Sequence, residues 1–194
     1  MASDTPNPDQ SAQDGASETQ DAADEGPSLA IITQYTKDLS FENPLAPTSL
    51  ASDEGQPHGD VSVKVKSRQI ADKTYEVVLE FEVKATQGEA VAFIVELAYG
   101  GVFRIAGFEE PTLSLVTMVE CPRILFPFAR RIIADSVRDG GFAPLMLQPI
   151  DFLALYQQHH AAAGGNGGLP EEDAEATFGD GPVGDGTGDT RDDD

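Results

Sequence analysis

The sequence offers few side chains that could perform catalysis. It has three histidines and one cysteine: His58 lies in a loop rich in proline and glycine, His159 and His160 end a predicted helix, and Cys121 precedes a proline. Nucleophilic catalysis needs a base that a further group orients against the nucleophile. No histidine lies inside a predicted strand or helix, where a neighbour could orient it. We therefore predict that the protein has no catalytic residues and is not an enzyme.

Patterns typical of cofactor and metal sites are also missing. We find no glycine-rich loop of the phosphate-binding kind, and Gly100–Gly101 is predicted to be a kink or bulge in a strand. The acidic residues show no metal-ligand spacing, and nearby lysines explain them as partners in solvated ion pairs. Cys121 is predicted to be a small core residue, and a single cysteine favours a reducing compartment such as the cytoplasm. We expect no cofactor and no bound metal.

Charge narrows the class of partner. The chain has 12 Lys plus Arg against 34 Asp plus Glu, a formal net charge of −22. Affinity for phosphates comes mainly from Lys and Arg that displace counterions, so we expect binding neither to nucleic acid nor to anionic lipid. The start of the chain lacks the basic and apolar residues of a signal peptide, and we predict no segment that inserts into a membrane. The favoured partners are basic or apolar.

The acidic residues are concentrated at the two ends of the chain. Residues 1–27 contain seven acidic residues and no basic one, and residues 161–194 contain ten acidic residues, one arginine and much glycine. Such compositions have too little apolar surface to offset the entropy of ordering. We predict a disordered acidic tail at 1–27, a single domain at 28–160 and a disordered, glycine-rich acidic tail at 161–194.

The first half of the predicted domain has the pattern of a sheet. Apolar and polar residues alternate in 61–66, more strongly in 74–84, and again in 91–99, and a weaker alternation is found in 29–41. This period of two is typical of strands with one buried face. Short strands that follow one another closely favour antiparallel pairing. The sequence therefore predicts a four-stranded antiparallel sheet.

After Pro111 the pattern changes to that of a helix. Pro122 and Pro127 lie inside this stretch and predict a kink or an irregular first half, and Gly140–Gly141 predicts its end. A short final helix is predicted to begin after Asp151, which is a good N-cap residue. Strands followed by helices indicate an α+β fold. The predicted apolar stripe of the long helix consists of Leu113, Val116, Val119, Leu125, Phe128, Ile132 and Ile133.

One sheet and one long helix leave apolar positions unused. The second face of the third strand around Ile94, the segment 145–147 and the last helix carry more apolar residues than a monomer of this size needs. Oligomerisation would bury them. The alternative is that they pack inside a monomeric core.

Several strings of the domain, in order, resemble one known family. The sequence is similar to the SecB family of protein-export chaperones from about residue 31 to residue 158, and the two tails fall outside the resemblance. The strings that carry it are Tyr35–Pro44, Tyr75–Leu79, Ala92-Phe93 with Glu96 and Gly100–Gly101, Cys121–Pro127 with Ala129-Arg130, and Pro149 with Asp151–Leu155.

The resemblance implies a homotetramer, a dimer of dimers, in which each subunit contributes a four-stranded antiparallel sheet, a long helix and a short C-terminal helix. It implies a cytoplasmic holdase that binds unfolded precursor proteins and delivers them to the SecA motor of the export pathway. A holdase acts by binding alone, so the missing catalytic residues are expected. Two alternatives stay open: a SecB-like chaperone dedicated to one client such as an antitoxin, and a small-molecule-binding α+β domain.

Site residues also follow from the resemblance. The positions that match the SecA-binding surface of the family, which receives the basic zinc-binding tail of SecA, are Asp38, Glu42, Ile94 and Glu96; isoleucine at 94 replaces the leucine of the family pattern. The loop after the first strand also lacks the family's tryptophan. The positions that match the client-binding groove are Phe41, Pro44, Leu45, Leu50, Phe152, Leu155 and Tyr156.

Overall fold

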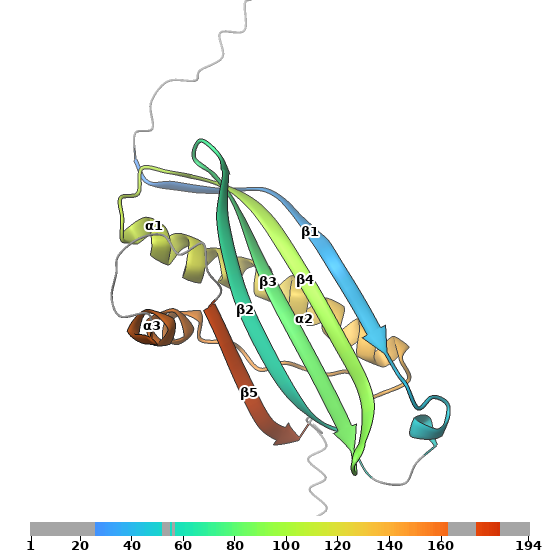
Figure 1. Ribbon diagram of the computed structural model, residues 1–194. Helices are drawn as coiled ribbons and strands as arrows, with labels where there is room; N and C mark the ends of the chain where they lie inside the picture. Colours follow the sequence, from blue (N-terminus) through green and yellow to red (C-terminus); the bar gives the residue numbers. More distant parts are fainter. Residues whose placement is uncertain (1–25, 52–54, 56, 163–173, 183–194) are drawn as a thin grey trace, which may run out of the picture.

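Five strands form one antiparallel sheet in the computed structural model, which describes residues 26–51, 55, 57–162 and 174–182. Their spatial order is β1-β4-β3-β2-β5 (Figure 1). The four predicted strands are all present, and the alternation in 61–66, 74–84 and 91–99 explains why the three later strands each have one buried and one wetter face, whereas the first has no buried residue. The strands are β1 Ser28–Glu42, β2 His58–Ala71, β3 Thr74–Gln87, β4 Ala90–Ala106 and β5 Ala174–Pro182.

The fifth strand was not expected. β5 comes from the region 161–194, which the composition predicts to be a disordered tail, and it pairs with the outer edge of β2. The reason is local: the edge of a sheet offers unpaired N–H and C=O groups, which a nearby segment of low β propensity can satisfy. Residues 1–25 and the remainder of 161–194 lie outside the described residues, apart from the end of the last helix.

Tight turns join the central strands. β2 returns as β3 through Asp72 and Lys73, and Lys73 has the left-handed φ of 51°. β3 returns as β4 through Gly88, whose φ is 61°. β1 instead pairs with β4, so the chain crosses from one side of the sheet to the other through a long loop that contains a short 3-10 helix, Thr48–Leu50.

A long helical run covers one face of the sheet. It consists of α1 Thr112–Leu115, a π-helical turn Val116–Glu120 and α2 Cys121–Asp139. The π turn comes directly before Pro122, which has no N–H to donate to a regular helical ladder, so the predicted irregular first half is confirmed. Gly140 ends the helix, with its N–H donating to the Ser136 carbonyl at 2.9 Å.

The final helix α3, Phe152–Ala162, begins as predicted. The Asp151 carboxylate accepts hydrogen bonds from the backbone N–H groups of Leu153 at 3.1 Å and Ala154 at 3.0 Å. These are two of the four N–H groups that a helix start leaves without an internal partner. The cap fixes where α3 begins after the extended segment that returns from α2.

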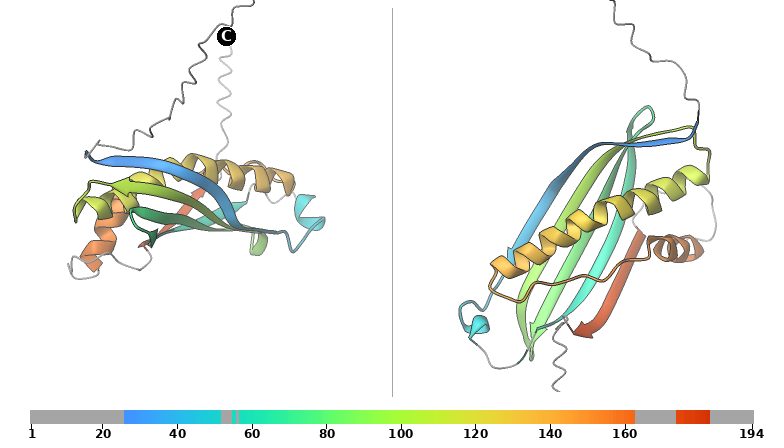
Figure 2. Two further views of the ribbon diagram at one scale, coloured as in Figure 1. Left: turned by 90° about the horizontal axis from the view of Figure 1, so that it is seen from above. Right: turned by 180° about the vertical axis from the view of Figure 1, so that it is seen from behind.

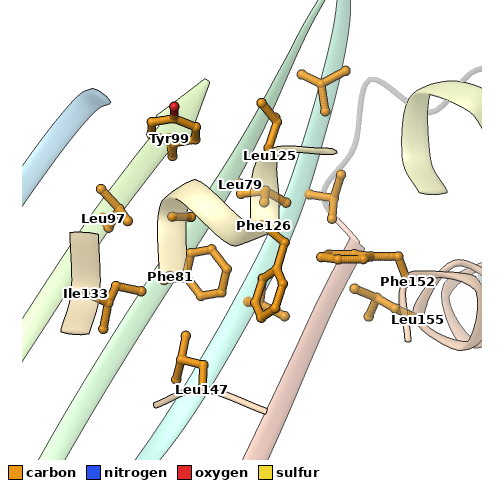
Figure 3. Packing of buried hydrophobic residues seen from close by; sticks show 14 of the residues in the cluster. Leu79, Phe81, Leu97, Tyr99, Leu125, Phe126, Ile133, Leu147, Phe152 and Leu155 are labelled. Atoms are coloured by element: carbon orange, nitrogen blue, oxygen red, sulfur yellow. The ribbon is translucent and has the colours of Figure 1, made fainter. Parts of the chain in front are cut away.

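The core lies between α2 and the sheet face that it crosses (Figure 2). Apolar residues of β2, β3 and β4 point toward the helix, and α3 closes one end of this layer. Phe126 of α2 lies beside Phe81 of β3 and Phe152 of α3, with ring centroids 6.3 and 6.0 Å away (Figure 3). The opposite sheet face carries no helix in the described part of the chain, and we call it the open face.

Gly100 and Gly101 do not form a bulge. β4 runs past both residues against β3 without a change of register. A Cβ at Gly101 would lie 2.8 Å from the Leu125 side chain, so this glycine allows α2 to approach the sheet closely. Register shifts instead occur in β1, around Ile32 and Lys37, and in β4 around Ala92.

One further expectation about the long helix is wrong. Phe128 was assigned to the buried stripe, but it is 44% exposed and its ring stacks on Tyr99 at 6.3 Å. Thr112–Asp139 also contains an 18-residue window of mean hydropathy 1.3, which by length and composition could cross a membrane. In that window 56% of residues are buried in the protein, as in the core helix of a globular domain.

Candidate functional site

The four residues matched to the SecA-binding surface lie together on the open face. In the register of β1 and β4, Asp38 is opposite Ala98, Ser40 is opposite Glu96, and Glu42 is opposite Ile94. Because alternate residues of a strand share a face, Asp38 and Glu42 point the same way as Ile94 and Glu96. Two neighbouring strands thus bring three carboxylates and one apolar side chain to one surface.

A fourth carboxylate joins this group from β3. Glu82 lies directly opposite Glu96, and both side chains are exposed. Like charges at directly opposite positions of neighbouring strands destabilise the pair. Sequence reasoning missed Glu82, because only the register of β3 against β4 sets it beside Glu96. We call Asp38, Glu42, Glu82 and Glu96 the carboxylate surface.

The carboxylate surface borders a shallow hollow of about 380 Å³ on the open face. Asp38, Glu82 and Glu96 line it together with Lys37 and Lys64. The register shift between Thr36 and Asp38 explains how two consecutive residues, Lys37 and Asp38, both reach the hollow. The open face therefore presents both signs of charge, with carboxylates on β1, β3 and β4 and lysines on β1 and β2.

Beside the hollow, Glu76 of β3 is a nearly buried carboxylate, 5% exposed. Tyr35 donates its hydroxyl hydrogen bond to Oε1, Lys37 donates to the same oxygen at 3.1 Å, and Arg68 donates to Oε2. Burial alone would raise the pKa of Glu76, but these three hydrogen bonds together lower it to about 2. Glu76 thus stays charged and links β3 to both β1 and β2.

The Glu76 cluster also affects its donors. Burial raises the pKa of Tyr35 to about 12, and the hydrogen bond to Glu76 adds to that shift. Lys37 is the residue at the register shift of β1, so its ion pair with Glu76 holds the chain at the place where Asp38 begins the carboxylate surface. From the sequence, the carboxylates of β3 were interpreted as partners in solvated ion pairs. Glu76 differs from the others because its side chain is buried.

The residues matched to the client-binding groove fall into two separate groups. Phe41 packs over the end of α2, where a Cβ on Gly140 would lie 2.1 Å from its ring, and it stacks on Phe93 at 6.0 Å. Leu50 lies over Gly141 in the same region. Pro44, Leu45 and Leu50 are exposed.

The second group belongs to α3, at the far end of the helical layer (Figure 1). Phe152 is 1% exposed and Leu155 is also buried, so both are core residues in a single chain. Tyr156 is half-buried and donates a hydrogen bond to the Ser114 hydroxyl at 3.1 Å. The structure therefore does not join the seven predicted groove residues into one continuous surface.

The cysteine and the histidines lie in different elements of the structure. Cys121 is fully buried in the core, and burial raises the pKa of its thiol to about 12, so the nucleophilic thiolate is disfavoured. His58 begins β2 and is exposed, whereas His159 lies near the end of α3. Among the described residues there is no group of three His, Cys, Asp or Glu side chains that could hold a metal ion.

Comparison with known proteins gives consistent matches. The family model described as "Preprotein translocase subunit SecB" matches residues 22–163. "Protein-export protein SecB" of Rhodopseudomonas palustris (strain BisB5) is 54% identical over 133 residues, covering 69% of this chain and 84% of the relative. The protein with the same description from Parvibaculum lavamentivorans (strain DS-1) is 50% identical over 139 residues, covering 72% and 83%.

A solved structure shares the fold. It is the Mycobacterium tuberculosis Rv1957 SecB-like chaperone in complex with a ChAD peptide from the HigA1 antitoxin. The TM-score is 0.53 and the sequence identity is 13%, and the match covers 63% of this chain and 90% of the other. At this identity the likeness concerns the arrangement of strands and helices.

We predict that Glu76→Gln removes a pH-dependent part of the stability. Folding depresses the pKa of Glu76 from 4.5 to about 2, so its contribution is present above about pH 4.5 and is lost as the pH falls toward 2. The exposed partners of Glu76 are screened by solvent. After allowance for this screening, we expect the charged Glu76 to contribute about 1–2 kcal/mol to the free energy of unfolding. Urea unfolding at several pH values between about 6 and 3 measures this free energy. Glu89→Gln, an exposed carboxylate in a turn, is the control, and identical pH profiles for wild type and Glu76→Gln would contradict the prediction.

Proposed function

Because this chain belongs to the SecB family and is a protein-export chaperone, we propose that it acts in the cytoplasm as a holdase that delivers unfolded precursors to the SecA motor. The observation that carries the proposal is the convergence of Asp38, Glu42, Ile94 and Glu96 on one open sheet face. A holdase needs surfaces for a client, for the motor and for its own assembly. Each surface has different chemistry, and the chain offers a region for each.

The carboxylate surface is the proposed SecA-binding site. Carboxylates at a protein surface attract a basic partner over a distance and raise the association rate, with a strong dependence on salt. Ile94 lies opposite Glu42 and two residues from Glu96, and it supplies an apolar contact, which does not depend on salt. Glu82 extends the site, because a basic partner would relieve its repulsion with Glu96.

Client binding is proposed for the loop that follows β1. Leu45 and Leu50 are exposed there, above the aromatic cluster in which Phe93 contacts Phe41 and Phe142. Exposed leucines on a loop can contact many apolar client side chains without a fixed register. The peptide complex of the M. tuberculosis neighbour supports the idea that this fold accepts a peptide. That complex concerns an antitoxin peptide, but no observation on this chain favours a single dedicated client.

Self-association as a homotetramer is proposed for the β1 side of the molecule. β1 is an outer strand of the sheet, and Ile31, Ile32 and Leu39 are exposed along it. Phe128 on α2 is exposed nearby, against Tyr99. A second copy would cover this apolar surface.

For the SecA-binding site, we expect Glu96→Lys to weaken binding of purified SecA roughly tenfold at low salt, because a repulsive charge replaces an attractive one. Glu82→Lys should act in the same direction, and both effects should shrink as salt rises. Glu89→Lys makes the same charge change in the β3–β4 turn and serves as the control. Titration by calorimetry or interferometry gives the affinities. Equal affinity of Glu96→Lys and wild type would rule out this surface.

For the client-binding loop, we expect Leu50→Ser to weaken binding of an unfolded polypeptide about fivefold, because a client would otherwise bury this side chain. Ile70→Ser is the matched control, since Ile70 is 46% exposed and Leu50 is 48% exposed, and Ile70 lies beside the β2–β3 turn. The delay in refolding of a denatured test protein measures the affinity. Equal losses in the two variants would mean that the loop has no special role.

For self-association, light scattering should give a mass near four times 20.6 kDa. Phe128→Asp is expected to lower this mass, because it places a charge in an apolar contact. Ile70→Asp introduces the same charge at another exposed apolar position and should leave the mass unchanged. A monomeric wild type at micromolar concentration would refute the tetramer.

A further inference from the structure

Strand β5 occupies the outer edge of β2. The two strands are antiparallel, and the register runs from His58 opposite Pro182 to Val65 opposite Ala174. β5 thus covers the first half of β2, whereas the second half, from Lys66 onward, has no strand on that side among the described residues. The sheet itself does not need β5, because β1, β4, β3 and β2 already form a continuous core.

The composition of β5 indicates a weak strand. Three of its nine residues, Gly179, Gly181 and Pro182, disfavour strand structure, and the register of β2 against β5 shifts between Gly59 and Val61. By contrast, β2 pairs with β3 through Val63, Val65 and their neighbours, which are buried in the core. β5 can therefore leave the edge at low cost, while β2 stays in place.

The edge that β5 covers suits an extended polypeptide. An edge strand presents a row of N–H and C=O groups that any extended chain can pair with, whatever its side chains. An unfolded client has such a backbone free. β5 also contacts α3, whose buried Phe152 lies beside this strand (Figure 3). A client strand at this edge would have to use the same backbone groups of His58–Val65 that β5 uses.

From this placement we propose that Ala174–Pro182 is a built-in competitor: β5 and an extended client polypeptide bind in turn to the outer edge of β2. The inference rests on client binding, as proposed above, and adds a second client contact and its regulation. β5 belongs to the same chain as β2 and also contacts α3, so it is held near this edge at a high effective concentration. Weak pairing is thus sufficient to cover the edge.

Two consequences follow from a tethered competitor. The edge is closed to other sheet edges when no client is present, which suppresses aggregation. Client affinity is also reduced by the fraction of time that β5 is bound, so an edge covered about 80% of the time would weaken binding about fivefold. Short or poorly extended segments would be rejected most strongly.

The test disrupts β5 in the full chain. The variant is Ala176→Pro/Thr177→Pro. Alternate N–H groups of β5 point toward β2, so one of these two consecutive residues donates a hydrogen bond to β2. Proline has no N–H, and the double substitution therefore removes that hydrogen bond and prevents pairing. The control is Val183→Pro/Gly184→Pro, which follows the strand in sequence and also introduces two consecutive prolines. The probe is a reduced, carboxymethylated polypeptide that cannot fold. We expect about fivefold tighter binding by the first variant and wild-type affinity for the second.

A locked form gives the opposite test. Val61 and Phe178 are Cα partners, so Val61→Cys/Phe178→Cys should form a disulfide on oxidation, whereas Val61→Cys/Ala174→Cys should not, because Ala174 is opposite Val65. Buried Cys121 should not interfere. The oxidised pair should bind the probe more weakly than wild type and recover on reduction.

The outcomes separate the two proposals. Unchanged probe affinity in both the proline variant and the locked form would overturn competition by β5 and leave client binding intact. Failure of the first cysteine pair to oxidise would contradict the register itself. If neither wild type nor the proline variant bound the probe, both the proposal of client binding and the proposal of competition by β5 would be refuted.

Discussion

The strict alternation of strand side chains is the constraint on which this structure depends. One set of positions in β2, β3 and β4 is apolar and packs on α2, and the other set forms the open face, where charged residues lie among apolar ones such as Ile94. A shift of one residue in any strand would exchange the two sets. Gly101 completes the arrangement, because only a residue without Cβ lets Leu125 reach the sheet. The same alternation that builds the core therefore also gathers the carboxylate surface.

The Glu76 cluster holds the open face together across three strands. Its carboxylate accepts from Tyr35 and Lys37 of β1 and from Arg68 of β2. A charge so nearly buried is tolerated because each oxygen is paired, and removal of one partner would leave that cost uncompensated. The cluster lies beside Asp38, so the pairing that stabilises the sheet also fixes where the proposed SecA-binding site begins. Lys37 takes part in both, because it pairs with Glu76 and directly precedes Asp38 in β1.

Much of this could be read from the sequence, because periodicity reports local geometry. The alternation in 61–66, 74–84 and 91–99 predicted the central strands, and Asp151 predicted the start of α3. The pattern could not give the pairing of strands, so it missed the position of Glu82 opposite Glu96 and the burial of Glu76. Phe128 was misplaced because the π turn breaks the regular helical period on which the predicted stripe was based. Composition misjudged β5, since a sheet edge can order a segment that would not form a strand alone.

The two edges of the sheet face different demands. β1 is long, and its exposed apolar residues favour a lasting contact, which suits a second copy of the chain. The edge of β2 must bind and release, because a holdase that never releases its client cannot support export. A strand with two glycines and a proline meets this demand: it satisfies the edge when no client is bound, yet its pairing is weak enough for a longer client strand to replace it. Strong β-forming residues in β5 would protect the edge better but would close it to clients. The weakness of this strand is therefore the property that lets one edge be both covered and available.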